Sequence, residues 1–182
     1  MLLILAAIGT GYWVIGKRAQ VQRQRALCAS HLSQLGKAIS TFADSGENLG
    51  RVPMTLRALH PAYIQDPRLF SCPSWSAESQ ASSPASAQSG DYLYFPNHTK
   101  SQGAAPLALC PHCGAGLGFN VLQGDGHVEW FATTPDQLET KLVKMGVPLR
   151  IERGMSAAEI QDVQTWRARL NLPPADPPEP LE

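Results

Sequence analysis

Uncharged, mostly apolar residues fill the first sixteen positions of the chain. The segment MLLILAAIGTGYWVIG has no charged side chain, and Lys17 and Arg18 follow it directly. As an α-helix it would be about 24 Å long at about 1.5 Å per residue, against about 30 Å for the hydrocarbon core of a bilayer. We expect residues 1–16 to be an uncleaved membrane anchor, because a signal peptide carries its positive residues before the apolar run. A helix buried in a protein core is the alternative.

Beyond this run, apolar residues recur with the period of an α-helix. Spacings of seven, four, three, four and three place them on one face, while Gln, Arg, Ser and Lys occupy the others. No proline precedes Pro53, so both segments can form one helix over roughly residues 2–44, with Gly46 as its stop. We expect this stripe to pack on the folded domain and to serve helix assembly; it comprises Val21, Cys28, Leu32, Leu35, Ile39 and Phe42.

The next part of the chain predicts short, irregular pieces. Four prolines within residues 47–75 indicate turns, a short helix near residues 55–59, and extended chain. Residues 76–90 are nearly all Ser, Ala and Gln, and they contain too little apolar surface to offset the cost of ordering, so we expect a mobile loop. The aromatic segment DYLYF, residues 91–95, predicts a strand.

A glycine-rich turn divides the segment FNVLQGDGHVEWF, residues 119–131, into two strand-like runs. Asp125 and Gly126 have the chemistry of a tight hairpin turn that needs positive φ. His127 and Glu129 share one face of the second strand. Together with Asp125 they could supply an acid, a base and an orienting carboxylate, but no Ser or Cys nucleophile accompanies them. We therefore expect Asp125 to bond the turn backbone and the other two to be solvated.

Two further helices are predicted in residues 132–171, before a proline-rich tail at 172–182. The first has Thr134 as its N-cap, with Gln137 completing a capping box, and it stops at Gly146. The second starts from a capping box, and its inner face combines aliphatic, aromatic and basic residues. The residues of that second helix are Ser156 and Glu159 in the box, and Ile160, Val163, Trp166 or Arg167, and Leu170 on the inner face.

The predicted fold is therefore α+β, with a long N-terminal helix packed on a small antiparallel β-sheet, and with C-terminal helices. We divide it into an anchor at 1–16, a helix and head at 17–131, a helical extension at 132–171, and the tail. Lys plus Arg and Asp plus Glu number 15 each, so no global field attracts nucleic acid, and we expect no such partner.

Four cysteines are the main candidates for chemistry. Cys110 and Cys113, in CPHCG, have the spacing at which two thiolates bind one zinc ion. The other half of a site would need Cys28, Cys72 or His112, and Cys28 lies on the apolar stripe, an awkward position for a ligand. In an oxidising compartment the four cysteines suit disulfides, with Cys110–Cys113 and Cys28–Cys72 as one pairing of three. We favour disulfides over zinc and over free thiols, and expect no other cofactor.

Three segments of the chain are LCASHLSQLGKAISTFADSGENLGRVP at residues 27–53, LFSCPSW at 69–75, and the later YLYF. The first resembles the stretch just beyond the membrane helix of bacterial type IV pilin-like and type II secretion pseudopilin-like proteins. The other two are similar to the Cys-Pro-Ser and tyrosine segments of the same group. FNVLQGDGHVEWF is similar to the NVLFxDGHV ending of the branch called the prepilin-type processing-associated H-X9-DG domain. The likeness covers about residues 1–131, and the last motif is represented here by Asn120, Asp125, Gly126 and His127.

The chain also departs from that family. The family begins with a basic leader ending in Gly and carries a Glu five residues into the mature chain, and neither is present here. Ala115 stands where the branch has its naming histidine, with His112 nearest, and His31 replaces an Asn. Either the true start lies upstream of Met1, or this is an anchored relative that is not processed.

The resemblance implies a non-catalytic, single-pass inner-membrane subunit of a type II secretion or type IV pilus-like system. Its partners would be membrane lipid and other pilin-like subunits, contacted through the N-terminal helix. The family keeps its head outside the cytoplasm, whereas the positive-inside rule, applied to the basic residues after the apolar run, would place it inside. We follow the family, because an upstream basic leader would restore the charge balance.

Two other functions remain open from the sequence. One is a membrane-anchored zinc-binding or sensor module that uses the pair Cys110 and Cys113. The other is an anchored extracytoplasmic enzyme.

Overall fold

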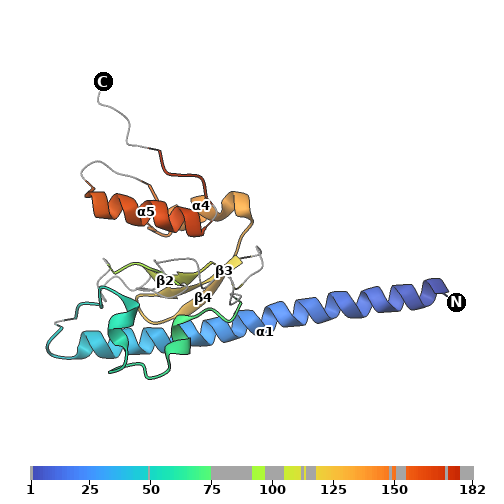
Figure 1. The fold of residues 1–182 in the computed structure, drawn as a ribbon, viewed down its shortest axis with the longest axis horizontal. Helices are drawn as coiled ribbons and strands as arrows, with labels where there is room; N and C mark the ends of the chain where they lie inside the picture. The colour runs from blue at the N-terminus through green and yellow to red at the C-terminus, as the bar shows by residue number, and fades with distance from the viewer. Residues whose placement is uncertain are drawn as a thin grey trace.

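The computed structural model describes the backbone of residues 2–48, 50–74, 92–96, 105–111, 113, 118–147, 149–150, 155–170 and 172–176, and their side chains except at 2–15, 135–136 and 158–159. These residues form one long helix, a four-stranded antiparallel sheet and two C-terminal helices, so the predicted α+β class is confirmed (Figure 1). The loop expected at 76–90, the histidine at 112 and the residue at 115 lie outside the described residues.

The helix α1 runs without a break from Leu2 to Asp44, as the sequence predicts. The middle of the stripe is buried, since Cys28, Leu32 and Leu35 are fully inaccessible to solvent and Ile39 is nearly so. Its two end members, Val21 and Phe42, are half-buried. The striped half of α1 therefore packs on the chain's own head.

The end of α1 differs from the prediction that Gly46 stops it. The Asn48 side chain donates to the Phe42 carbonyl at 2.9 Å, and the Gly50 backbone N–H donates to the Ala43 carbonyl at 3.0 Å. Gly50 has φ +78°, a conformation that glycine adopts at little cost. The terminal carbonyls of the helix are thus satisfied by residues further along the chain.

The sheet has the order β1-β2-β3-β4, with β1 at Leu93–Tyr94, β2 at Pro106–Cys110, β3 at Gly118–Gln123 and β4 at Val128–Ala132. All three pairings are antiparallel. The β3–β4 hairpin confirms the prediction from the glycine-rich turn. The aromatic run of 91–95 contributes only the two-residue strand β1.

Both faces of this sheet are covered, so the head has three layers. Alternate residues of β2 and β3 face opposite layers, which is the period of a strand. Ala108, Cys110 and Leu122 pack toward α1 and the short 3₁₀ helices η1 (Leu56–Leu59) and η2 (Pro67–Phe70). Figure 1 shows α1 on one side of the sheet and the two C-terminal helices on the other. The residues facing those helices are Leu93, Leu109, Phe119 and Val121.

The second layer of helices consists of α4, Pro135–Lys144, and α5, Ala157–Arg169. Thr134 is the N-cap residue of α4 as predicted, but its side chain makes no cap hydrogen bond, so the capping-box prediction is wrong. The Thr134 backbone carbonyl accepts from Gln137 N–H at 3.0 Å instead. Gly146, with φ +82°, follows the end of α4. The capping box of α5 includes Glu159, whose side chain lies outside the described residues.

Within α5, the predicted inner face is confirmed, and it is Arg167 rather than Trp166 that lies deepest. Arg167 is 5% exposed, and its Nη1 donates to Glu139 Oε1 of α4 at 2.6 Å and to the Leu149 carbonyl at 2.9 Å. Its Nε donates to the Pro173 carbonyl. Trp166 is half-buried and makes an edge contact with the ring of Phe95.

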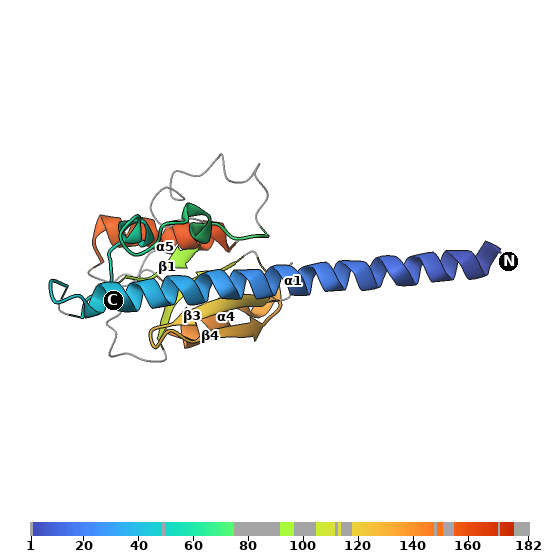
Figure 2. The same cartoon turned by 90° about the horizontal axis from the view of Figure 1, so that it is seen from below.

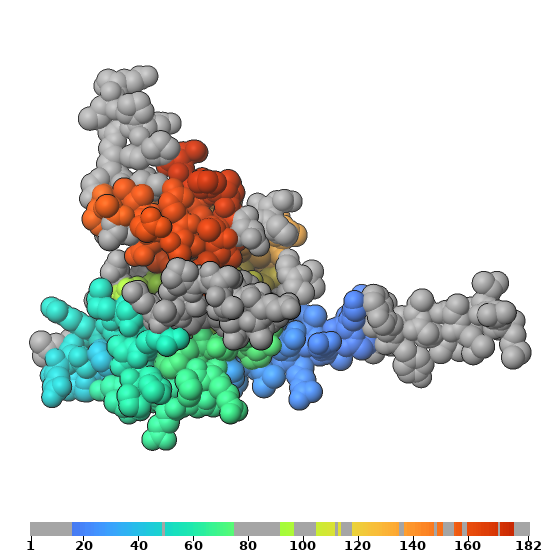
Figure 3. Space-filling view, viewed as in Figure 1, coloured from blue at the N-terminus to red at the C-terminus, as the bar shows by residue number. Residues whose placement is uncertain are grey.

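The first half of α1 extends beyond the head. Figure 2 shows the helix crossing the sheet and continuing past it, and in Figure 3 the deep-blue side chains at the start of the described part lie outside the body of the head. Residues 16–20 are all exposed. Among the helical residues with described side chains, no stretch combines the length and apolar character needed to cross a bilayer.

Candidate metal centre

Four cysteines that are far apart in the sequence meet in the layer between α1 and the sheet. Cys28 comes from α1, Cys72 follows η2, Cys110 ends β2, and Cys113 lies just beyond it. None is more than 2% exposed, and no disulfide bond joins any of the four. The disulfides Cys110–Cys113 and Cys28–Cys72 named from the sequence are therefore not formed in this structure.

The sulfur atoms lie close enough to share one ion. The Sγ atoms of Cys28, Cys110 and Cys113 are all within 4.8 Å of one another, and these three residues could hold a metal ion. The Sγ of Cys72 is 3.1 Å from the Sγ of Cys110. In a tetrahedral zinc site with Zn–S bonds of about 2.3 Å, neighbouring sulfurs are about 3.8 Å apart. The sulfur–sulfur distances in this cluster are of similar size.

Cys28 corrects the sequence interpretation most directly. Its position on the apolar stripe was an argument against its being a ligand. Because the stripe is the face of α1 that packs on the head, the same position delivers this thiol to the end of β2. The signal was in the sequence, since every member of the stripe was expected to face the folded domain.

The two other segments approach through local turns. Cys113 Sγ lies 3.7 Å from the Cys110 carbonyl, which closes the C-x-x-C turn. The backbone N–H of Ser74 donates to Cys72 Sγ at 3.4 Å. The segment before Cys72 is held by its Ser71 carbonyl, which is 3.1 Å from His31 Nδ1 on α1 and accepts from the Tyr92 hydroxyl at 3.3 Å. The ligand positions are thus fixed by contacts with α1 and with the sheet.

The four cysteines differ in the direction of their pKa shifts. A hydrogen bond from Cys110 lowers the pKa of Cys72 to about 3, and a second from Cys28 adds to this. Hydrogen bonds from the same two thiols, with Cys110 the stronger, lower the pKa of Cys113 to about 4. Burial, followed by the hydrogen bonds to its neighbours, raises the pKa of Cys110.

The remaining thiol, Cys28, completes this arrangement. Its hydrogen bond with Cys110 lowers its pKa, but hydrogen bonds to Cys113 and Cys72 and burial outweigh that and raise it. Cys72 and Cys113 are thus the cysteines whose pKa is lowered, and Cys28 and Cys110 are those whose pKa is raised. A buried thiolate needs hydrogen-bond donors or a cation beside it.

Two polar residues border the sulfurs. Asn120, 2% exposed, donates a backbone hydrogen bond that lowers the pKa of Cys113, and its side-chain Nδ2 donates to the Arg25 carbonyl of α1 at 3.0 Å. Ser74 Oγ is buried, and it lies close enough to Cys72 to help lower the pKa of that thiol. The sequence reasoning missed Ser74.

The acidic and basic side chains of the hairpin lie away from the thiols and act within the turn. Asp125 Oδ1 accepts from the His127 backbone N–H at 2.8 Å, and Gly126 has φ +86°, as predicted from the Asp-Gly pair. Glu129 Oε2 accepts from Gln123 Nε2 at 3.1 Å, and both His127 and Glu129 are exposed. Each side chain is accounted for by the hairpin itself.

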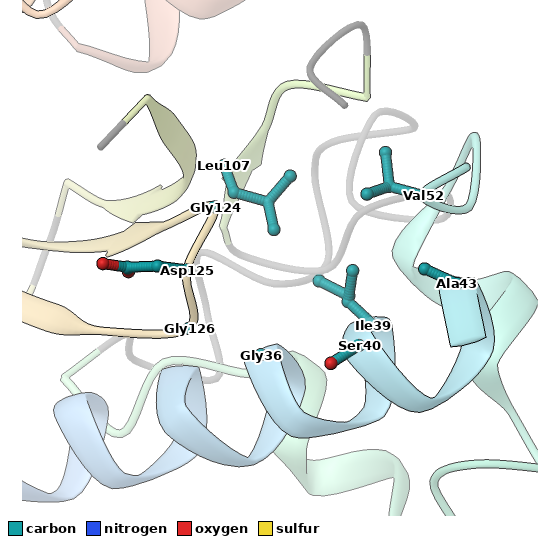
Figure 4. Close-up of a pocket in the computed structure, with 9 residues that line it drawn as sticks. All are labelled: Gly36, Ile39, Ser40, Ala43, Val52, Leu107, Gly124, Asp125 and Gly126. Atoms are coloured by element: carbon teal, nitrogen blue, oxygen red, sulfur yellow. The ribbon is translucent and has the colours of Figure 1, made fainter. Parts of the chain in front are cut away.

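A small hollow lies between the hairpin turn and α1, as Figure 4 shows. Its volume is about 40 Å³, close to the space of a single water molecule. Ile39, Val52 and Leu107 contribute its apolar lining, and the Asp125 carboxylate points away from Ile39. A hollow of this size holds no substrate. Comparison with protein-family models, with curated proteins and with solved structures finds no match to this chain.

Proposed function

We propose that this protein is a non-catalytic, pilin-like subunit of a type II secretion or type IV pilus-like system. Residues 1–16 anchor it in the inner membrane, its head lies outside the cytoplasm, and copies assemble through the part of α1 that precedes the head. The observation that carries this proposal is a single 43-residue helix whose second half packs on the head and whose ribbon continues past the head (Figure 2), with residues 16–20 exposed.

An uncovered helix of this kind needs a partner. Residues 1–16 contain no charged side chain. A helix in a protein gains most of its stability from the packing of its apolar side chains and not from its own hydrogen bonds. Lipid can cover such a segment in a membrane, and equivalent segments of neighbouring subunits can cover it in a filament. Continuity with the head in one helix makes both states compatible with the same fold.

The position of the stripe narrows the surface available for assembly. Cys28, Leu32 and Leu35 are covered by the chain's own head, which corrects the expectation that the whole stripe serves helix assembly. Contacts between subunits would therefore involve the part of α1 before Cys28. Lys17 and Arg18 are exposed at the start of this part, where they can meet anionic lipid headgroups.

Membrane fractionation of the full chain tests the anchor. We expect the protein to sediment with bacterial membranes and to resist an alkaline wash. Ile8→Arg places a charge at the middle of the apolar run, at a cost of about 3 kcal/mol for insertion, and should release most of the protein. Gln22→Arg adds the same charge at an exposed position after the run and should leave the protein in the membrane. Full-length protein that is soluble and monomeric without detergent would refute the proposal.

Photo-crosslinking tests the assembly surface. A photoreactive residue at Gln20, which is exposed on the projecting part of α1, should yield crosslinked dimers in native membranes. The same residue at Glu47, exposed at the other end of the helix, should yield far fewer. Equal yields at the two positions would mean that α1 does not mediate the contact.

A further inference from the structure

We propose that Cys28, Cys72, Cys110 and Cys113 together bind one zinc ion in a closed four-thiolate site that fastens α1 to the head. The site joins a helix, a loop and a strand end whose ligands span residues 28–113. It does not depend on the proposed function, because a soluble or an anchored protein could contain it equally well.

The number and arrangement of donors point to a single ion. Three of the sulfurs form a group in which every pair lies within 4.8 Å, and the fourth lies 3.1 Å from one of them. Because Cys110 Sγ belongs to the group of three and is also the neighbour of Cys72 Sγ, the four sulfurs form one cluster and not two separate pairs. Four cysteine sulfurs gathered in this way, three of them mutually close and the fourth beside Cys110, are a donor set that structural zinc takes.

The surroundings match those of metal-bound thiolates. The backbone N–H of Ser74 donates to Cys72 Sγ at 3.4 Å, as second-shell donors do in metal sites. Zinc binding requires the ligands as thiolates, so it would release the thiol protons to solvent and offset half of the negative charge of the four sulfurs.

Burial indicates a structural role for the ion. All four ligand residues are at most 2% exposed, and four thiolates leave no open coordination position for a substrate. This argues against the sensor module that the sequence left open, because an exchangeable ligand would have no access. The zinc would instead hold together three segments that the chain brings in from different directions.

The direct test is the zinc content of the full chain, purified in detergent under reductant without chelator. We expect one zinc ion per chain, and cobalt-loaded protein should show the visible bands of tetrahedral cobalt bound to thiolates. A chain that binds neither ion under these conditions, or that takes up iron in place of zinc, would overturn the assignment. So would two native disulfides, which would appear as a loss of four hydrogen masses in the intact protein.

Substitution of one ligand provides the residue-level test. Cys28→Ser should lower zinc affinity by more than about 100-fold, because a neutral hydroxyl replaces a thiolate ligand. Ala26→Ser adds a hydroxyl at an exposed position of α1, keeps all four cysteines and serves as the matched control, with one zinc ion retained. A folded Cys28→Ser protein with unchanged zinc content and unchanged cobalt spectrum would exclude α1 from the site.

A measurement on the unmodified protein covers the case in which Cys28→Ser does not fold. Stepwise modification of thiols with an organic mercurial should release zinc, detected with a coloured chelator, and release should be complete only as all four cysteines are consumed. Removal of the ion with a strong chelator should lower Tm by at least about 10 °C, since a structural zinc contributes directly to folding. Complete release after only two cysteines react would contradict the four-thiolate site.

Discussion

At the scale of single residues, the motif that carries the family resemblance is explained by folding. Asn120 bonds the backbone of α1 through its side chain, and Asp125 bonds the backbone of its own turn. The turn glycine Gly126 has positive φ. His127 is exposed and contributes its backbone N–H to the turn. Asn120 ties the hairpin to the helix, and Asp125 and Gly126 shape the turn, which explains the types of these three residues. The backbone bond of His127 does not depend on its side chain.

Two glycines with positive φ allow a comparison of strain with crowding. Gly118 begins β3 at φ +152°, and a Cβ there would overlap the Phe131 carbonyl and come within 2.6 Å of the Trp130 ring. Gly126 has φ +86°, with no atom within 4 Å of the position of a Cβ. Both substitutions to alanine are strained by the backbone, but only Gly118→Ala also requires the β3–β4 pair to move apart.

We therefore predict unequal losses of stability. Gly126→Ala should lower the free energy of unfolding by about 1 kcal/mol, the cost of a left-handed conformation for a residue with a Cβ. Gly118→Ala should lower it by at least about 3 kcal/mol, because overlap with backbone adds to the strain. Urea unfolding followed by circular dichroism measures both. Equal losses would mean that the sheet has room at Gly118.

At the scale of elements, the periodicity of the sequence predicts single helices and hairpins, but not which elements far apart in the sequence pack on one another. The stripe identifies α1 and its buried face, and the Asp-Gly pair identifies the hairpin. The burial of β2 and β3 on both faces does not follow from their sequences, because an apolar run does not say which helix covers which side. Convergence of the four thiols is a consequence of that packing. The sequence identified the pair Cys110 and Cys113 and the inward-facing position of Cys28, but not that Cys28 and Cys72 both meet this pair.

The contact between α4 and α5 depends on one buried guanidinium. Arg167→Met removes its hydrogen bonds to Glu139, Leu149 and Pro173 and leaves the acceptors without this donor. We predict a loss of about 3 kcal/mol in the free energy of unfolding, together with faster hydrogen exchange in α5 than in α1.

Matched substitutions separate this effect from a change in total charge. Arg150→Met removes the same charge from an exposed side chain and should change the free energy of unfolding by no more than about 0.5 kcal/mol. Glu139→Gln should cost less than Arg167→Met, because the Glu139 side chain is 34% exposed and can be solvated. If Arg150→Met and Arg167→Met lower the free energy of unfolding equally, the hydrogen bonds of Arg167 contribute nothing to stability.

At the scale of the whole molecule, the sheet separates two cores. One lies against α1, and the other lies under α4 and α5. The segment after residue 131, which the family resemblance does not cover, supplies most of the second cover. In this chain it is part of the head's core and not an appendage to it.

Removal of that cover tests this view. A chain that ends at Thr133 would expose Leu109, Phe119 and Val121, which are at most 2% exposed in the full protein. We predict that this truncated protein binds a hydrophobic dye, aggregates and loses its cooperative thermal transition, whereas the full chain unfolds in one step. Cooperative unfolding of the truncated protein with an unchanged Tm would show that the sheet needs α1 alone.

The continuity of α1, from the part that projects beyond the head to the part packed on it, fixes the geometry of the molecule. Its second half is embedded in the core, and Gly36 lets it approach so closely that a Cβ there would come within 2.7 Å of Leu122. The helix cannot shift along its axis or rotate about it without repacking that contact. Every copy therefore has its head at the same height along α1 and at the same angle around it. If copies assembled through α1, the rise and rotation from one copy to the next would be constant.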